Sequence, residues 1–137
     1  MEETIYPGIR RILAPNPSPM TYTGTNTYLI GHKEIAVIDP GPQSASHLKT
    51  ILKAIKPGSK ITKIFVTHSH LDHSPLAAAL SEKTNAKIYA YGDSFSGRSV
   101  EMSKLAENNL IGGGEGVDAT FQPDISLMDG TALSHDK

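Results

Sequence analysis

The chain contains no cysteine among its 137 residues. This absence excludes disulfide bonds and thiolate ligands, so any metal ion bound by these residues must be held by nitrogen and oxygen atoms. The sequence also lacks a run of about eighteen apolar residues, the length that a membrane helix needs. Residues 1–4 lack the basic and then apolar pattern of a secretory signal. We therefore expect a cytoplasmic protein that does not enter the membrane.

An excess of positive charge is missing as well. The 13 lysines and arginines are balanced by 14 aspartates and glutamates, which gives a net charge of -1 and a pI near 6.6. No overall positive field attracts nucleic acid or an anionic membrane. Nucleic acid is therefore not the expected partner, since its binding would need a local basic patch. A small-molecule substrate is expected instead.

Histidine, in contrast, is concentrated in one short segment. His68, His70, Asp72 and His73 fall within six residues, directly after the apolar run 61–67. An extended turn presents alternate side chains, so His68 and His70 can converge on one ion while Asp72 and His73 turn toward a second. Imidazole and carboxylate are good zinc ligands at about 2.0 to 2.2 Å. Exposed loop histidines without a role would explain this density poorly, and the segment is predicted to bind metal.

The same segment carries a family resemblance. Residues 67–74, Thr-His-Ser-His-Leu-Asp-His-Ser, resemble the signature of the metallo-β-lactamase superfamily. Residues 24–30 with 36–41, and residues 121–124 with 127–130, are similar to the same family. The first of these two stretches is especially similar to the branch of β-lactamase-like protein 2 and glyoxalase II-like hydrolases. The resemblance covers nearly the whole chain. It implies an α/β fold, the αββα sandwich, of which residues 1–137 would form mainly the N-terminal αβ half within one domain.

The resemblance also implies a role for each matching residue. His68 and His70 would bind the first metal ion, and Asp72 and His73 would bind the second. Asp72 would in addition be catalytic, by orienting the nucleophile or taking up its proton. Asp39 would orient a ligand through a hydrogen bond, as ligating histidines generally require. A plain turn carboxylate before a Pro-Gly pair is the alternative interpretation of Asp39.

The expected partners of these ligands are not all in the sequence. The family supplies a later histidine for each ion and an aspartate that bridges them, and neither the bridging aspartate nor the last histidine has a counterpart here. His135 lies near the region of the third histidine but lacks the Pro-Gly turn that would aim it, so it is not expected to be a ligand. The chain is therefore expected to be the N-terminal part of an enzyme, with a C-terminal part missing.

The function implied by the family is hydrolysis. Two zinc ions, with iron or manganese as substitutes, would lower the pKa of a bridging water and give hydroxide near neutral pH. The bond attacked would be a thioester, ester, lactam or phosphodiester. Two alternatives stay open: a non-catalytic metal-binding fragment or scaffold, and an RNA-processing nuclease of the same superfamily.

Hydrophobic periodicity places these residues on elements. It predicts strands at residues 9–13, 27–30, 35–38, 61–66 and 87–91, and helices at residues 43–56, 75–80 and 98–109. Ser74 is expected to cap the second helix, with Pro75 at its first position, and His47 is expected at a helix edge. A half sandwich would expose one sheet face, so association between copies is also expected.

The region after residue 91 gives weaker signals. In the family that the sequence resembles, this region varies and can border the substrate pocket, so the resemblance makes Tyr91, Ser94 and Arg98 candidates for substrate contacts. Surface or packing roles are the favoured interpretation of all three.

Overall fold

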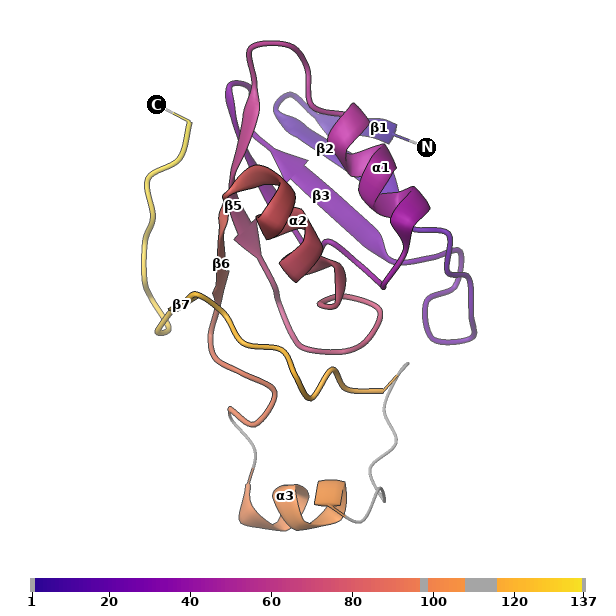
Figure 1. Cartoon of the computed structure of the whole chain (residues 1–137), viewed down its shortest axis with the longest axis vertical. Helices are drawn as coiled ribbons and strands as arrows, with labels where there is room; N and C mark the ends of the chain where they lie inside the picture. The colour runs from indigo at the N-terminus through magenta and orange to yellow at the C-terminus, as the bar shows by residue number, and fades with distance from the viewer. Residues whose placement is uncertain (1, 97–98, 108–115, 137) are drawn as a thin grey trace.

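The computed structural model describes residues 2–96, 99–107 and 116–136 (Figure 1). In these ranges the strands form one seven-stranded sheet, in the order β1 to β7 along the chain. The strands are β1 (Glu2–Tyr6), β2 (Ile9–Leu13), β3 (Asn26–Ile30), β4 (Glu34–Ile38), β5 (Lys60–Phe65), β6 (Lys87–Ala90) and β7 (Ile125–Ser126). The helices are α1 (Ala45–Lys53), α2 (Leu76–Thr84) and α3 (Val100–Glu107).

The first four strands form an antiparallel meander. Short turns join β1 to β2 and β3 to β4, whereas residues 14–25 form a longer connection between β2 and β3. The β3–β4 hairpin aligns Tyr28 with Ile38. The strands predicted at residues 27–30 and 35–38 are thus confirmed, and they pair as a hairpin. Strand β1 was not predicted, because all five of its residues are exposed and no apolar alternation marks it.

The last four strands are parallel, and helices connect the first three of them. Helix α1 joins β4 to β5, and α2 joins β5 to β6, so the predicted strand, loop, helix and strand after residue 61 are confirmed. Parallel strands end at the same edge of a sheet. The loops that follow β4, β5 and β6 therefore meet, and this edge is the place where open sheets bind ligands.

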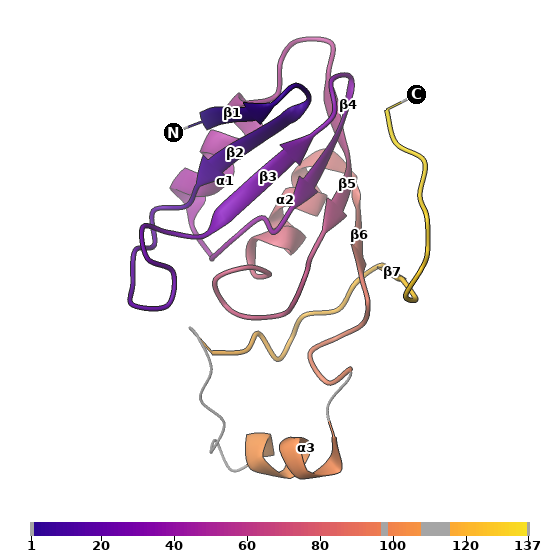
Figure 2. The same ribbon diagram turned by 180° about the vertical axis from the view of Figure 1, so that it is seen from behind.

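Helices α1 and α2 lie on one face of the sheet, and the opposite view shows β1 to β4 without a helix in front of them (Figures 1 and 2). The main core lies between these helices and the sheet, with Leu29, Val37, Ile51, Ile64 and Leu80 fully buried. On the other face a cross-strand row is half-buried; it consists of Tyr28, Ile38, Phe65 and Tyr89. The expected α/β half, one sheet with helices on one face, is confirmed.

Helix starts differ from the prediction in one place. Helix α2 begins at Leu76 with Pro75 as its N-cap, and Ser74 does not cap it. The Ser74 side chain is buried and donates to the His70 carbonyl and the Asp118 carboxylate instead, so the histidine loop uses the hydroxyl. Within the described ranges no helix is long and apolar enough to cross a bilayer.

Candidate metal centre

The histidine segment forms the loop between β5 and α2, and residues 67–74 are called the metal loop below. Its last turn is closed by the amides of His73 and Ser74, which both donate to the carbonyl of His70 at 3.0 and 3.1 Å. The carbonyl of His73 accepts from the amide of Gly41, 2.9 Å away, in the turn after β4. The loop is thus fixed both to itself and to the neighbouring strand end.

The loop brings the predicted ligands together. The ring centroids of His68 and His70 are 4.6 Å apart, and those of His68 and His73 are 4.1 Å apart. One potential ligand atom each of His68, His70 and Asp72 lies within 4.8 Å of the others, and the same holds for Asp39, His68 and His73. All five residues predicted for the site therefore converge on one small volume.

Asp39 lies at the centre of the hydrogen bonds that hold this arrangement. Its backbone is left-handed, with φ at +53°, and only 6% of the residue is exposed. Oδ1 accepts from the Thr67 amide at 2.8 Å, while Oδ2 accepts from the Thr67 hydroxyl at 2.7 Å and from Nδ1 of His73 at 2.9 Å. Both carboxylate oxygens are thus engaged, which fits the predicted orienting role better than that of a plain turn carboxylate.

These hydrogen bonds set which imidazole nitrogen carries the proton. The single hydroxyl proton of Thr67 goes to Asp39, so the Thr67 oxygen accepts from Nδ1 of His68, 2.9 Å away. His73 likewise donates from Nδ1 to Asp39. In the neutral form of both rings Nε2 then carries the lone pair that a metal ion needs, and Nε2 of His73 lies 3.2 Å from Oδ2 of Asp72.

Asp72 provides a test of whether the residues fit a metal ion. Its Oδ2 lies 3.2 Å from Nε2 of His73, and two lone pairs at that distance repel unless a proton or a cation lies between them. Its Oδ1 is buried and has no hydrogen-bond partner among the described residues. A buried carboxylate oxygen without a partner is costly. A divalent cation bound by nitrogen and oxygen donors would satisfy both atoms, so the residues fit the group.

Burial and neighbouring charges shift the pKa values of His68 and His73 in opposite directions. Burial lowers the pKa of His68, and the nearby His73 and His70 lower it further, so its neutral form is favoured. Burial alone would lower the pKa of His73 too, but the hydrogen bond and charge of Asp39, with the charge of Asp72, outweigh it and raise the pKa. Burial raises the pKa of Asp39, and hydrogen bonds from His73 and Thr67 reverse this effect and lower it.

A later segment supports the metal loop and was not predicted. The amide of Leu71 donates to the carbonyl of Gly116 at 2.9 Å, and the amide of Asp118 donates to the carbonyl of Ser69 at 2.7 Å. A β-bridge between His70 and Val117 lies between these two bonds. Chain segments more than forty residues apart thus pair here, and no local sequence pattern marks such a contact.

His47, like Ser74, does not lie where the sequence pattern predicted it. It is only 1% exposed, so it is a buried residue and not a helix-edge one. Its Nε2 lies 2.8 Å from the hydroxyl of Thr27, which in turn donates to the backbone carbonyl of Asp39 at 2.8 Å. The signal was present, because His47 shares a helix side with Ile51, which is fully buried.

The remaining candidates lie apart from the ligands or beside them. His135 contacts the Ile30 carbonyl and Lys63, so it is not brought to the metal loop.

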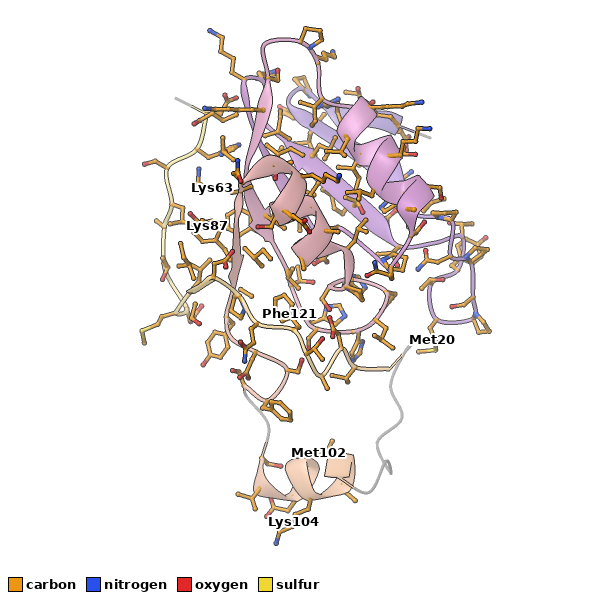
Figure 3. All side chains as sticks on the ribbon, in the orientation of Figure 1. Met20, Lys63, Lys87, Met102, Lys104 and Phe121 are labelled. Carbon is orange, nitrogen blue, oxygen red and sulfur yellow. The ribbon has the colours of Figure 1, made fainter. Side chains whose placement is uncertain are left out.

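Tyr91 and Ser94 line a cavity of about 150 Å³ that also borders His68 and the buried Phe121, which Figure 3 labels beside the loop. Tyr91 is exposed, whereas Ser94 is buried and bonds to the Asp118 carbonyl. Arg98 lies outside the described residues.

Comparisons with known proteins agree with this geometry. The chain is 39% identical over 92 residues to a β-lactamase-like protein 2 homolog of Drosophila melanogaster, a match that covers 60% of this chain and 30% of the relative. It is 38% identical over 74 residues to an atrochrysone carboxyl ACP thioesterase of Passalora fulva, covering 53% of this chain and 22% of the relative. The chain therefore spans less than a third of the length of these curated relatives.

Solved structures share the fold. A β-lactamase domain protein from Burkholderia ambifaria superimposes with a TM-score of 0.69 at 20% identity, over 98% of this chain and 44% of that one. The family model of the metallo-beta-lactamase superfamily matches residues 20–120, which include Asp39 and the whole metal loop. With both the sequence match and the fold in agreement, the chain belongs to the metallo-beta-lactamase superfamily.

Proposed function

We propose that the protein is a metal-dependent hydrolase with a pair of divalent ions, zinc being favoured. His68 and His70 hold one ion, and Asp72 and His73 hold the other. The observation that carries the proposal is the Asp72 carboxylate, whose buried Oδ1 has no hydrogen-bond partner among the described residues and whose Oδ2 lies 3.2 Å from Nε2 of His73. A cation is the simplest group that would satisfy it, because the neighbouring rings offer nitrogen donors of the type zinc prefers.

The residues of the chain have separable tasks in this proposal. Asp39 accepts the Nδ1 proton of His73, and Thr67 accepts that of His68, which leaves the Nε2 lone pair of each neutral ring for an ion. Asp72 binds an ion and holds the attacking water or takes up its proton. The ions, when bound, supply a water of lowered pKa and polarise the oxygen of the bond under attack.

A thioester is the substrate class that we favour among the bonds considered. Several curated relatives, those of Passalora fulva and Claviceps purpurea among them, bear the name of a carboxyl ACP thioesterase. The cavity of about 150 Å³ beside His68 borders the cluster and is lined in part by serines and Tyr91. It can hold a small acyl group next to the ions. Esters, lactams and phosphodiesters are the alternatives that the assay below separates.

The test combines metal content with turnover. Purified protein should contain close to two equivalents of zinc by elemental analysis, and the His68→Ala/His70→Ala variant should lose most of it. A His32→Ala/His135→Ala variant, which removes two histidines outside the metal loop, is the matched control and should keep its zinc. Hydrolysis of a simple thioester should follow the zinc content and exceed that of an ester, a lactam and a phosphodiester.

A second function, metal binding without catalysis, is favoured by one observation. Each proposed ion has two ligands here, whereas catalytic zinc usually has three protein ligands. Zinc bound by the metal loop without turnover of any of the four substrates would support this second function. Zinc that stays unchanged in the His68→Ala/His70→Ala variant, or is missing from the wild type, would refute both.

A further inference from the structure

A buried polar chain connects helix α1 to the metal loop. His47 on α1 contacts the hydroxyl of Thr27 on β3, and the same hydroxyl donates to the backbone carbonyl of Asp39. His47 is 1% exposed and Thr27 is fully buried. Buried polar groups of this kind are retained only when each has a partner, because an unpaired one costs free energy.

The direction of each hydrogen bond in this chain follows from the groups involved. The backbone carbonyl of Asp39 can only accept, so the single hydroxyl proton of Thr27 must point to it. The contact between Thr27 and His47 must then use the imidazole as donor, with its proton on Nε2. His47 therefore donates to one lone pair of the hydroxyl, and the hydroxyl proton is left to point at the Asp39 carbonyl.

This polar connection ends at Asp39, whose backbone conformation is strained. Asp39 has a φ of +53°, in the left-handed region that costs a non-glycine residue free energy. Two residues later Gly41 has a φ of +102°, and a Cβ atom on it would lie 3.2 Å from Cδ2 of His47. The turn after β4 thus packs directly against the imidazole. In this conformation the Asp39 carboxylate reaches Thr67 and His73.

We propose that His47 and Thr27 are positioning residues, which hold the turn at Asp39 and thereby orient the histidines of the metal loop. Neither residue reaches the ligand atoms, and both act through Asp39. The effect on metal affinity rests on the proposed function, whereas the effect on the turn does not. Thr67 reports the effect on the turn, because its amide donates to Oδ1 of Asp39.

The experiment compares two neighbouring amides in metal-free protein by hydrogen exchange. The amide of Thr67 bonds to the Asp39 side chain, while that of Val66 bonds to the carbonyl of Tyr89 within the sheet. In His47→Leu we expect the protection of Thr67 to fall about ten-fold with that of Val66 unchanged. His47→Gln, which keeps a donor near the position of Nε2, should restore it. Ile51→Val, a conservative core change on the same helix, is the control.

A second readout is zinc affinity, measured by competition with a chelator. His47→Leu should weaken it by about ten-fold, the lower end of the range for residues that orient ligands, and His47→Gln should stay close to the wild type. Thr27→Val should behave like His47→Leu, and combining the two should cost no more than either alone, because both act through one connection.

The outcomes separate the two proposals. If the amides of Thr67 and Val66 lose protection equally in His47→Leu, the residue acts on global stability only and the positioning role is wrong. Unchanged protection of Thr67 would overturn it as well. If the wild type binds no zinc, the proposed function fails, and the comparison of the two amides still decides whether His47 and Thr27 hold the turn.

Discussion

Two regions at opposite ends of the sheet both gather histidine and aspartate, and they differ in how those side chains are used. At the carboxyl ends of β4 to β6, Asp39 and Asp72 are buried beside three histidines. At the β3–β4 turn, the half-buried Asp136 lies beside His32 and His135. The segment after β7 reaches this turn by running back beside β6 and β5 (Figures 1 and 2).

The difference lies in the unused atoms. The Asp136 carboxylate accepts from the backbone amides of His32, Lys33 and Glu34 at 2.7, 3.2 and 3.1 Å, and both ring nitrogens of His135 have contacts. In the second region, the Asp136 carboxylate and the His135 ring therefore already have partners, and they join the segment after β7 to the β3–β4 turn. In the metal loop, Asp72 keeps a buried oxygen without a partner among the described residues. The residue types alone therefore do not identify a metal site. What distinguishes the metal loop is that possible ligand atoms converge there and one buried oxygen among them has no hydrogen-bond partner among the described residues.

The largest expected effect comes from changing one aspartate in each region. Asp72→Asn keeps the shape and removes the charge, so affinity for the second ion should fall by at least about 100-fold, because even the partners of ligands are worth 10- to 100-fold. Asp136→Asn should leave zinc affinity unchanged. Isothermal titration with zinc measures both. Equal losses in the two variants would contradict the distinction drawn between the regions.

A smaller loss is expected at Asp39, the residue expected to orient the proposed ligands. Asp39→Asn removes one acceptor oxygen shared by Thr67 and His73, so we expect zinc affinity to fall by 10- to 100-fold. The measurement is competition with a chelator. Affinity within two-fold of the wild type would show that the His73 ring is held without Asp39.

The third prediction concerns pH and the buried imidazole beneath the first region. Burial lowers the pKa of His47 from 6.5 to about 4. Between pH 4 and pH 6.5 this histidine is therefore protonated in the unfolded chain and neutral in the folded protein. Stability rises with pH wherever the unfolded state binds more protons, and therefore falls as the pH drops below 6.5. From pH 7 to pH 5 this group should reduce the free energy of unfolding by about 2 kcal/mol.

Urea unfolding at the two pH values tests this sign. His47→Gln should lose about 2 kcal/mol less than the wild type over the same pH interval, because the titrating group is gone. Ile51→Val, on the same helix, should follow the wild type. A variant curve parallel to the wild-type curve would mean that His47 takes up its proton equally in both states.

The smallest effect is expected in the second region. Asp136→Ala removes the acceptor for three backbone amides, so hydrogen exchange at residues 32–34 should become faster. Zinc affinity should stay within two-fold, since the turn lies away from the metal loop. A change in zinc affinity comparable to that of Asp39→Asn would show that the two ends of the sheet are coupled.

Local pattern accounts for much of the fold and for the choice of the proposed ligands. The β-branched runs predicted β2 to β6 within a few residues, and helical spacing predicted α1. The metal loop was identified because its spacing is itself the signal. The start of α2 was misplaced, since Ser74 resembles a capping residue in sequence but is used by the loop and by Asp118.

The sequence by itself determined the four proposed ligands and the order of strand, loop and helix around them, because these depend on residues near one another in the chain. Only the tertiary structure decided how the ligands are supported. Thr27 lies on β3, His47 lies on α1 and Asp39 lies in the turn after β4. Residues 116–118 pair with the metal loop from more than forty residues away. Such contacts follow from the packing of helix on sheet and from the buried polar groups that must find partners there, and no local periodicity encodes them.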